Sequence, residues 1–348
     1  MKRNSIYIFF CSLLLLTVSF TEENPYYIIT KKDVRLILPK DFPKPVYDFK
    51  NNKISPEGFT LGRRLFYDPI LSKDSSTSCA SCHQKFAAFA HIDHPLSHGI
   101  NGLIGTRNVP ALQNLIWQDK FMWDGSINHL ELQPIAPITN SREMDESLLN
   151  VIKEVQDNKD YALLFYKAYK DTVITSERIL KSLTQFLGLM ISSNSKYDRF
   201  IRGEEKFTED EHRGLTLFRM NCENCHKEPL FTDNSFRNAG ISYDTLLNDP
   251  GRKSLTGLDS DYMKFKVPSL RNVELTYPYM HDGRFRNLQQ VMEHYNTISR
   301  QDPNVDKSLV RNMKLTKKDL ADLFVFLKTL TDQSFLHDRR FADPFYKL

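Results

Sequence analysis

The stretches Cys79-Ala-Ser-Cys82-His83 and Cys222-Glu-Asn-Cys225-His226 decide the architecture of this chain. In each of them, two residues separate a pair of cysteines and a histidine follows directly, a spacing typical of c-type haem attachment. The two thiols form thioether bonds to a porphyrin, and the histidine then ligates its iron. Two such motifs predict two covalently bound haem c groups, and therefore redox chemistry.

Two other uses of paired cysteines agree less well with the sequence. A thioredoxin-like dithiol needs a βαβ context, and neither motif follows an apolar strand pattern. A zinc site could combine both cysteine pairs, but the pairs lie far apart and each carries a histidine that a four-cysteine site would not need.

The remaining cysteine and the charge balance bear on the compartment. The chain has 348 residues, enough for two domains, and its fifth cysteine, Cys11, lies in a basic and then apolar stretch. That stretch predicts a signal peptide over residues 1–20 and a bacterial periplasmic location, with an uncleaved membrane anchor as the alternative. Four haem propionates would nearly cancel the net charge of +4, so we expect no nucleic-acid partner.

The chain repeats itself around the two motifs, which predicts an internal duplication. Strand alternation is nearly absent, so we expect an all-α fold of two tandem cytochrome c-like haem domains, over residues 21–202 and 203–348. Helices are predicted over Pro56–Tyr67, Glu209–Phe218 and the linker Glu177–Ile201, and Thr316 with Asp319 resembles a capping box. The matched segments are Gly62-x-x-Leu65-Phe66 with Gly214-x-x-Leu217-Phe218, Val109-Pro-Ala-Leu112 with Val267-Pro-Ser-Leu270, Met122-x-Asp124-Gly125 with Met280-x-Asp282-Gly283, and Leu180 to Leu187 with Leu320 to Leu327.

The two halves differ at one position that bears on ligation. Tyr295 is the seventh residue after Leu288, and Pro137 is the seventh after the matched Leu130. A tyrosine can ligate iron and a proline cannot, so the second haem would be closed and the first open to a small oxidant. The alternative is that Tyr295 is an ordinary core residue of an amphipathic helix. Glu143 could shuttle protons near an open haem, or could be a solvated carboxylate.

These residues and their neighbours resemble the bacterial dihaem cytochrome c peroxidase/MauG family over nearly all of the chain that follows the predicted signal. The motifs that carry the resemblance are both haem sites, Gly105-Thr-Arg-Asn108-Val-Pro110, Phe121-Met-Trp123-Asp-Gly125, Pro137-Ile-Thr-Asn-Ser-Arg-Glu143-Met144, and Val267-Pro-Ser-Leu-Arg-Asn-Val-Glu-Leu-Thr-Tyr-Pro-Tyr-Met-His281-Asp-Gly283.

The resemblance implies a role for several residues of the first half. The N-terminal haem would be peroxidatic and the C-terminal haem would supply its electrons. Glu143 would be the catalytic acid–base, with Gln133 lining the distal pocket and Pro137 over the iron. Trp123 would lie between the haems and assist electron transfer. His98 matches the histidine that caps the N-terminal haem at rest in many of these peroxidases, although His91 and His94 lie close enough in sequence to confuse that assignment.

The resemblance also implies a metal site and a ligand in the second half. Asn108, with the backbone carbonyls of Thr276 and Pro278, matches the inter-haem calcium site, and oxygen ligands suit Ca²⁺. Tyr295 occupies the place where the peroxidases carry a methionine ligand and MauG carries a tyrosine. However, MauG has a tryptophan two residues before its second haem motif, used to oxidise a protein, and this chain has Met220 there.

The sequence therefore predicts a periplasmic dihaem peroxidase that reduces hydrogen peroxide to water. Electrons would come from a small redox protein such as a cytochrome c or a cupredoxin, and a homodimer is a possible assembly. The alternatives are a MauG-like oxidase that acts on a protein substrate, and a dihaem electron carrier without enzymatic activity.

Overall fold

The computed structural model describes residues 29–298, 304–309 and 313–346. The predicted signal peptide lies outside these residues. The described chain is mostly helical, as expected, and its one sheet has two short antiparallel strands, β1 (Phe236–Arg237) and β2 (Phe265–Lys266). The α-helices are α1 (Pro56–Tyr67), α2 (Cys79–Cys82), α3 (Ile135–Thr139), α4 (Leu148–Asp157), α5 (Lys159–Tyr169), α6 (Ser176–Gly188), α7 (Lys196–Ile201), α8 (Glu209–Asn221), α9 (Lys253–Thr256), α10 (Leu288–Thr297), α11 (Lys317–Lys328) and α12 (Gln333–Leu336).

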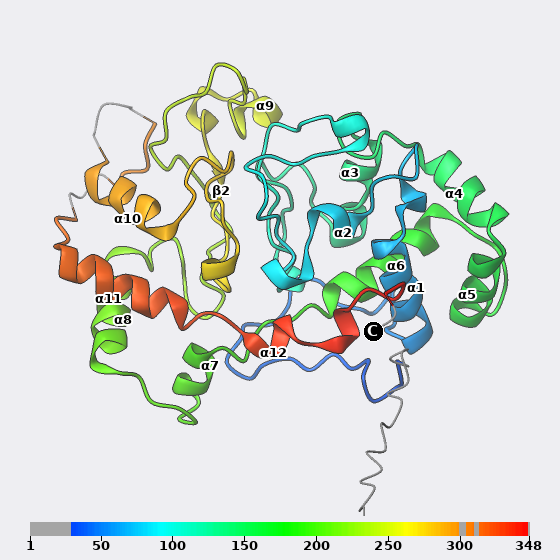
Figure 1. The fold of residues 1–348 in the computed structure, drawn as a ribbon, viewed down its shortest axis with the longest axis horizontal. Coiled ribbons are helices and arrows are strands. Elements are labelled where there is room, and N and C mark those ends of the chain that lie inside the picture. Colours follow the sequence, from blue (N-terminus) through cyan, green and yellow to red (C-terminus); the bar gives the residue numbers. More distant parts are fainter. Residues whose placement is uncertain (1–28, 299–303, 310–312, 347–348) are drawn as a thin grey trace, which may run out of the picture.

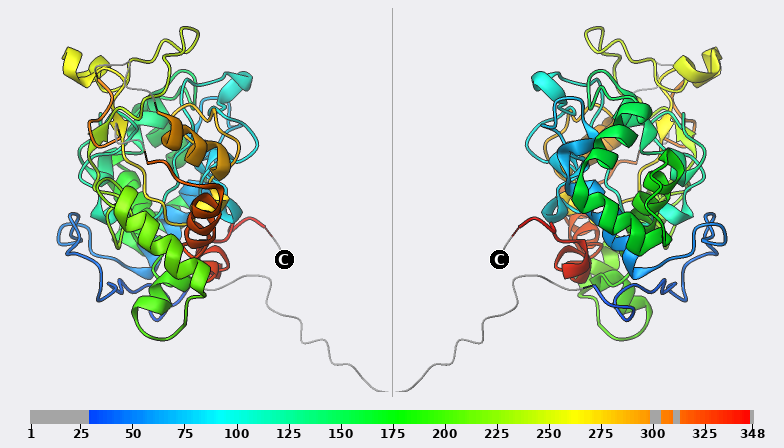
Figure 2. Two further views of the ribbon diagram at one scale, coloured as in Figure 1. Left: turned by 90° about the vertical axis from the view of Figure 1, so that its left-hand side faces the viewer. Right: turned by 90° about the vertical axis from the view of Figure 1, so that its right-hand side faces the viewer.

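One close helix pair organises each half of the molecule. Helix α1 packs against α6, and α8 packs against α11 (Figure 1). Both pairs cross at a glycine, because a Cβ on Gly62 would lie 1.8 Å from the Ser182 carbonyl oxygen, and one on Gly214 would lie 2.1 Å from that of Asp322. Only glycine permits so close an approach of two helix backbones. The end-on views of Figure 2 show α8, α10 and α11 at one end of the molecule and α4 to α6 at the other.

The predicted helix starts agree with the structure. Helix α1 has the predicted bounds, with Ser55 as its N-cap, and α8 begins at Glu209 but runs three residues past the predicted end. Thr316 and Asp319 form the expected capping box of α11, in which each side chain satisfies a backbone N–H of the other.

The buried side chains of the described residues form two hydrophobic cores, and each core includes residues from both sides of residue 202. Tyr197 of α7 belongs to the second core, with Phe218 and Phe326. After α11, the chain crosses back beneath the first half (Figure 1), where Phe335 and Phe341 join the first core. The last residues therefore tie the two halves together, and the predicted domains of residues 21–202 and 203–348 remain a prediction.

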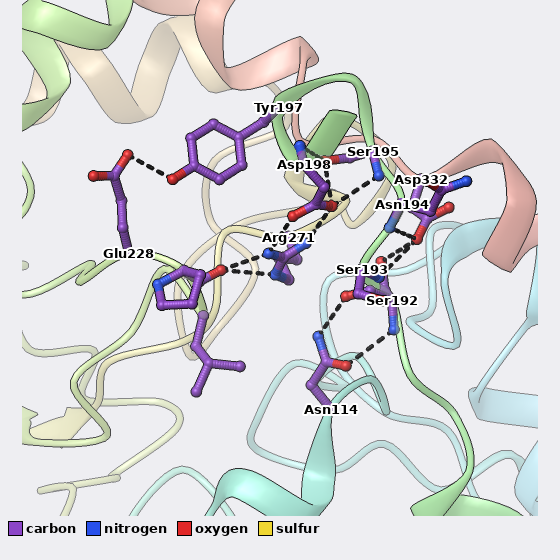
Figure 3. Close-up of polar contacts among 12 residues, drawn as sticks. Asn114, Ser192, Ser193, Asn194, Ser195, Tyr197, Asp198, Glu228, Arg271 and Asp332 are labelled. Carbon is purple, nitrogen blue, oxygen red and sulfur yellow. Dashed lines mark hydrogen bonds and ion pairs between the residues drawn. The ribbon is translucent and has the colours of Figure 1, made fainter. Parts of the chain in front are cut away.

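The predicted continuous helix Glu177–Ile201 is wrong, because the chain is extended between α6 and α7. A buried polar network replaces the helical hydrogen bonds there (Figure 3). The carboxylate of Asp332 accepts hydrogen bonds from the backbone N–H groups of Ser193 and Asn194 and from the hydroxyl of Ser192. The side-chain amide of Asn114, in the first half, donates to the Ser192 carbonyl and accepts from the Ser192 backbone N–H. These partners, distant in sequence, satisfy backbone groups that a helix would satisfy locally.

A buried ion pair lies next to this network. The guanidinium of Arg271 is fully buried and donates to both carboxylate oxygens of Asp198, at 2.8 and 2.9 Å (Figure 3). It also donates to the carbonyl of Pro229. Such a pair is stable in the interior only when its remaining donors and acceptors are also satisfied, which is the case here.

The two halves share backbone conformations that non-glycine residues seldom adopt. Met122 and Met280 have φ angles of 65° and 75°, and Asn114 and Asn272 both have a φ angle of 57°. Met122 and Met280 are matched residues of the repeated segments, and Asn114 and Asn272 each lie two residues after the matched Leu112 and Leu270. A left-handed conformation is costly for methionine, so its occurrence at matched positions is a specific likeness between the halves.

Candidate active site

A single cavity of about 670 Å³ connects the two Cys-x-x-Cys-His motifs. Cys82 and His83 line it in the first half, and Cys222, Cys225 and His226 line it in the second. Both motifs form a tight turn in which the histidine N–H donates to the carbonyl of the first cysteine, His83 to Cys79 and His226 to Cys222, at 2.9 Å each. The turn thus brings each histidine next to its two thiols.

Each motif histidine is oriented by a backbone carbonyl. The Nδ1 atom of His83 donates to the Phe89 carbonyl at 2.8 Å, and that of His226 lies 3.2 and 3.1 Å from the carbonyls of Phe231 and Pro268. Burial lowers the pKa of both imidazoles, to about 4 for His83, so both rings are neutral. Fixing Nδ1 in this way leaves Nε2 for a metal, which is how metal-ligating histidines are usually held.

The residues present fit a covalently bound haem at each motif. All four motif cysteines are free of disulfides. Burial raises the pKa of the Cys79 and Cys222 thiols to about 12, which is the opposite of the lowered pKa of a reactive dithiol. With the neutral, oriented histidines and one cavity spanning both motifs, this chemistry favours haem over the dithiol alternative.

The predicted acid–base group lies in the wall of this cavity in the first half. Glu143 lines the cavity together with Gln133 and Pro137 of α3, and its Oε1 atom accepts a hydrogen bond of 3.1 Å from Asn140. Burial raises the pKa of the Glu143 carboxyl above its usual 4.5, and the hydrogen bond from Asn140 opposes this only in part. A carboxyl group with a raised pKa exchanges protons more readily near neutral pH. Gln133 is close to Met122, with its amide 4.0 Å from the sulfur.

Trp123 lies in the wall of the same cavity and is held by both halves of the molecule. Its indole Nε1 donates to the Asn108 carbonyl at 2.8 Å, and its own carbonyl accepts the backbone N–H of Lys266 at 2.7 Å. These contacts bring a first-half residue against strand β2 of the second half.

Tyr295 of α10 also lines the cavity, close to both cysteines of the second motif. Its hydroxyl makes no hydrogen bond with any residue that the structure describes, and burial raises its pKa. The neighbouring His294 instead directs its Nε2 atom to the Ala239 carbonyl, at 2.8 Å, and does not line the cavity. Of these two adjacent residues, Tyr295 is therefore the one whose side chain is available to the second motif.

His98 is not in the cavity wall, although its backbone is near the first motif. Its carbonyl lies 3.3 Å from the Cys82 sulfur, and its ring centroid lies 4.2 Å from that of His94. The ring of His91 is also nearby, so His98 and the two alternative ligand candidates, His91 and His94, form one cluster. Ligation of iron by His98 stays a prediction.

The three predicted calcium ligands, Asn108, Thr276 and Pro278, all line the cavity. Asn108 donates its amide nitrogen to the Pro95 carbonyl at 2.9 Å, which leaves its amide oxygen for a cation. The described residues contain no group of three or more His, Cys, Asp or Glu side chains that could hold a metal ion. An amide oxygen and two backbone carbonyls are hard ligands of the kind that Ca²⁺ accepts.

Arg107 and Lys266 are charged side chains of the cavity wall to which the sequence motifs assigned no role. Arg107 lines it and pairs with Asp124 at 2.7 Å and Asp249 at 2.6 Å, so it connects the two halves. Lys266 lines it without a carboxylate partner among the described residues. A single lysine or arginine carries no local pattern that would distinguish it from surface residues of the same type.

Comparison with known proteins places the chain in a family. The family model described as "Di-haem cytochrome c peroxidase" matches residues 56–206. Methylamine utilization protein MauG of Methylophilus methylotrophus is 31% identical, over 84% of this chain and 86% of that protein. The chain belongs to the di-haem cytochrome c peroxidase/MauG family. Cytochrome c551 peroxidase of Nitrosomonas europaea is 33% identical, over 78% of this chain and 79% of its own length.

A solved structure agrees with the fold of this chain. The structure of a MauG-like protein associated with microbial copper homeostasis superposes with a TM-score of 0.81, at 31% identity, and covers 89% of this chain and 99% of that one. Membership of this family implies haem as the cofactor, and the family includes both cytochrome c peroxidases and MauG proteins. Among the residues described by the structure, no helix is long and apolar enough to cross a membrane.

Proposed function

We propose that the protein is a periplasmic dihaem oxidoreductase that reduces hydrogen peroxide to water. The observation that carries the proposal is the asymmetry of the cavity. Glu143, Gln133 and Pro137 line it in the first half, and Tyr295 lines it at the second motif. The haem at His83 would then be open to peroxide, and the haem at His226 closed.

Glu143 would move the proton that peroxide cleavage requires. When bound, haem at His83 supplies the iron that accepts the peroxide and the electrons that break the O–O bond. The Glu143 carboxylate takes the proton from the oxygen nearer the iron and donates it to the departing oxygen, which leaves as water. Gln133 would orient the peroxide by hydrogen bonding. Asn140 holds the carboxylate in place through its hydrogen bond to Oε1.

Trp123 would assist electron transfer between the two haems. Its position in the cavity wall and its two hydrogen bonds to the backbone support this role, because they fix the ring. Two electrons per peroxide would come from a small periplasmic donor such as a cytochrome c or a cupredoxin, and enter at the His226 haem. Tyr295 would ligate that iron, and an anionic phenolate favours the higher oxidation states of iron relative to a methionine ligand.

The proposal includes two tandem cytochrome c-like domains that arose by duplication. The matched glycine crossings and the shared left-handed φ angles of Met122 and Met280 support it. It also includes a calcium ion at Asn108, Thr276 and Pro278, which would stiffen the junction between the halves. The proposed periplasmic location is supported by the apolar segment around Cys11, which resembles a signal peptide. It is also supported by the haem motifs, because haem c is normally attached after export.

A MauG-like oxidation of a protein substrate is the second candidate, favoured by Tyr295 and by the MauG relatives. Met220 opposes it, because this exposed side chain stands where MauG carries the tryptophan that oxidises its substrate. The two tryptophans of this chain, Trp117 and Trp123, lie in the first half. A third candidate, an electron carrier, would have both irons blocked.

Donor oxidation separates these candidates. Protein with two haems is mixed with reduced cytochrome c and limiting hydrogen peroxide, and the absorbance of the donor is followed. The proposal predicts that two donor molecules are oxidised per peroxide. Consumption of peroxide with no oxidation of any cytochrome or cupredoxin donor would contradict it and favour the MauG-like alternative. A carrier would leave peroxide unconsumed and would show no high-spin haem in its resting ferric spectrum.

A further inference from the structure

The cations that line the cavity differ in how they are neutralised. Within the described residues they are Arg107, Arg142, Arg237 and Lys266. Arg107 and Arg237 each form ion pairs with two aspartates. Arg142 is exposed and donates to the Ile104 carbonyl. Lys266 is half-buried in the cavity wall and has neutral hydrogen-bond partners only.

The ammonium group of Lys266 has one donor left over. Its Nζ atom donates to the side-chain oxygen of Gln118 at 2.5 Å and to the Lys120 carbonyl at 2.9 Å. An ammonium group has three N–H donors, so one remains for a further acceptor. Burial lowers the pKa of Lys266 to about 8, and Asp119 opposes this effect only in part. A half-buried cation whose hydrogen-bond partners are all neutral is costly, so this position in the cavity wall favours a negatively charged partner.

The partner can be identified from the chemistry of the cavity. Each haem c carries two propionate carboxylates, and the cavity that would hold the haems is the one that Lys266 lines. We propose that Lys266 forms an ion pair with a haem propionate where the two halves meet, and thereby raises the reduction potential of that haem. The Lys266 backbone N–H donates to the Trp123 carbonyl, so the lysine backbone is held next to the residue proposed to assist electron transfer. This inference rests on the haem content of the proposed function.

A matched lysine lies two residues earlier in the chain. Lys264 pairs with Asp261 at 3.3 Å and does not line the cavity. Removing the charge of Lys264 changes the net charge of the protein by the same amount as removing that of Lys266. The effect of a contact with a propionate can therefore be separated from the effect of net charge.

The test is the reduction potential of each haem in holoprotein carrying two haems, measured by spectroelectrochemical titration. In Lys266→Met, an uncompensated propionate should stabilise ferric iron, and the reduction equilibrium of one haem should shift about tenfold, which is 59 mV for a one-electron couple. The other haem should be unchanged. Lys266→Arg should stay close to wild type, and Lys264→Met should shift neither haem. The resonance Raman band of propionate bending should move in Lys266→Met only.

Three results separate this inference from the proposed function. Wild-type potentials in a two-haem Lys266→Met variant would overturn the ion pair and leave the peroxidase assignment intact. If Lys266→Met fails to bind both haems, Lys266→Arg should still bind both, because it keeps the positive charge. Loss of a haem from Lys266→Arg as well would overturn the inference and show that the Lys266 side chain serves in packing. Failure of the wild-type protein to bind two haems would instead contradict the proposed function, and pyridine haemochrome assay measures this independently.

Discussion

The indole Nε1 of Trp123 donates a hydrogen bond of 2.8 Å to the backbone carbonyl of Asn108. Asn108 in turn donates its backbone N–H to the carbonyl of His281, at 2.6 Å. The tryptophan is thus connected through one residue to the second half of the molecule. A ring fixed in this way suits electron transfer, because the geometry between donor and acceptor does not fluctuate with side-chain rotation.

Trp123→Phe removes both the indole and this hydrogen bond. We expect transfer of electrons from the second haem to the first to slow about tenfold or more, which corresponds to about 1.4 kcal/mol of barrier. Stopped-flow oxidation of pre-reduced protein by peroxide measures this rate. Trp117→Phe is the control, since Trp117 packs in the first core and donates to the Pro43 carbonyl. Equal rates in the two variants would remove Trp123 from the electron path.

Glu143→Gln keeps the size of the side chain but cannot exchange a proton. General acid–base help is typically worth about 10²–10⁴ in rate, so peroxide turnover should fall at least about tenfold while both haems still bind. Glu177→Gln is the control, because Glu177 is exposed and paired only with Lys181. Its activity should stay within about twofold of wild type. Wild-type turnover in Glu143→Gln would exclude this carboxylate from the mechanism.

The pH profile should reflect the burial of Glu143. The carboxylate must be deprotonated to accept a proton from peroxide, so activity should fall as the pH falls through its pKa. Because burial raises that pKa above 4.5, the decline should begin at a higher pH than for an exposed glutamate. The acid limb of kcat/KM should be absent from Glu143→Gln measured with the same donor. An acid limb common to both proteins would assign the titration to another group.

The buried pair of Arg271 and Asp198 should stabilise the junction of the halves. Arg271→Met leaves the Asp198 carboxylate buried without its cation, which should lower the free energy of unfolding by about 3–5 kcal/mol. Urea unfolding followed by circular dichroism measures the change. Lys50→Met breaks the exposed surface pair with Asp48 and should cost less than about 1 kcal/mol. Similar losses in both variants would show that burial adds nothing to this pair.

Local signals in the sequence predicted the helices, and they did so for identifiable reasons. Ser55 before Pro56, and Thr316 with Asp319, mark helix starts through hydrogen bonds made within one turn. The linker was predicted wrongly because its break depends on Asp332, which lies far along the chain and accepts its N–H groups. A contact of this kind leaves no periodic pattern in the linker itself.

In the candidate site, too, the features that depend on neighbouring residues were predicted and those that depend on distant contacts were not. The haem motifs are local, and the comparison of Pro137 with Tyr295 required only the internal repeat. Lys266 was not predicted, because what distinguishes it is its burial and the absence of a carboxylate partner among the described residues. Both properties are tertiary, and neither can be inferred from the letters around position 266.

The central claim is that one haem is open and the other is closed by Tyr295. Electron paramagnetic resonance of the ferric protein, with two haems per chain, tests it most directly. In the ferric protein we predict one low-spin signal from the second haem, which Tyr295→Phe alters without loss of haem. We also predict one high-spin signal from the first haem. If His98 caps that iron at rest, the high-spin signal appears when the second haem is reduced. Two low-spin signals in the ferric protein, with no high-spin signal on half-reduction and no change of either low-spin signal in Tyr295→Phe, would contradict the account.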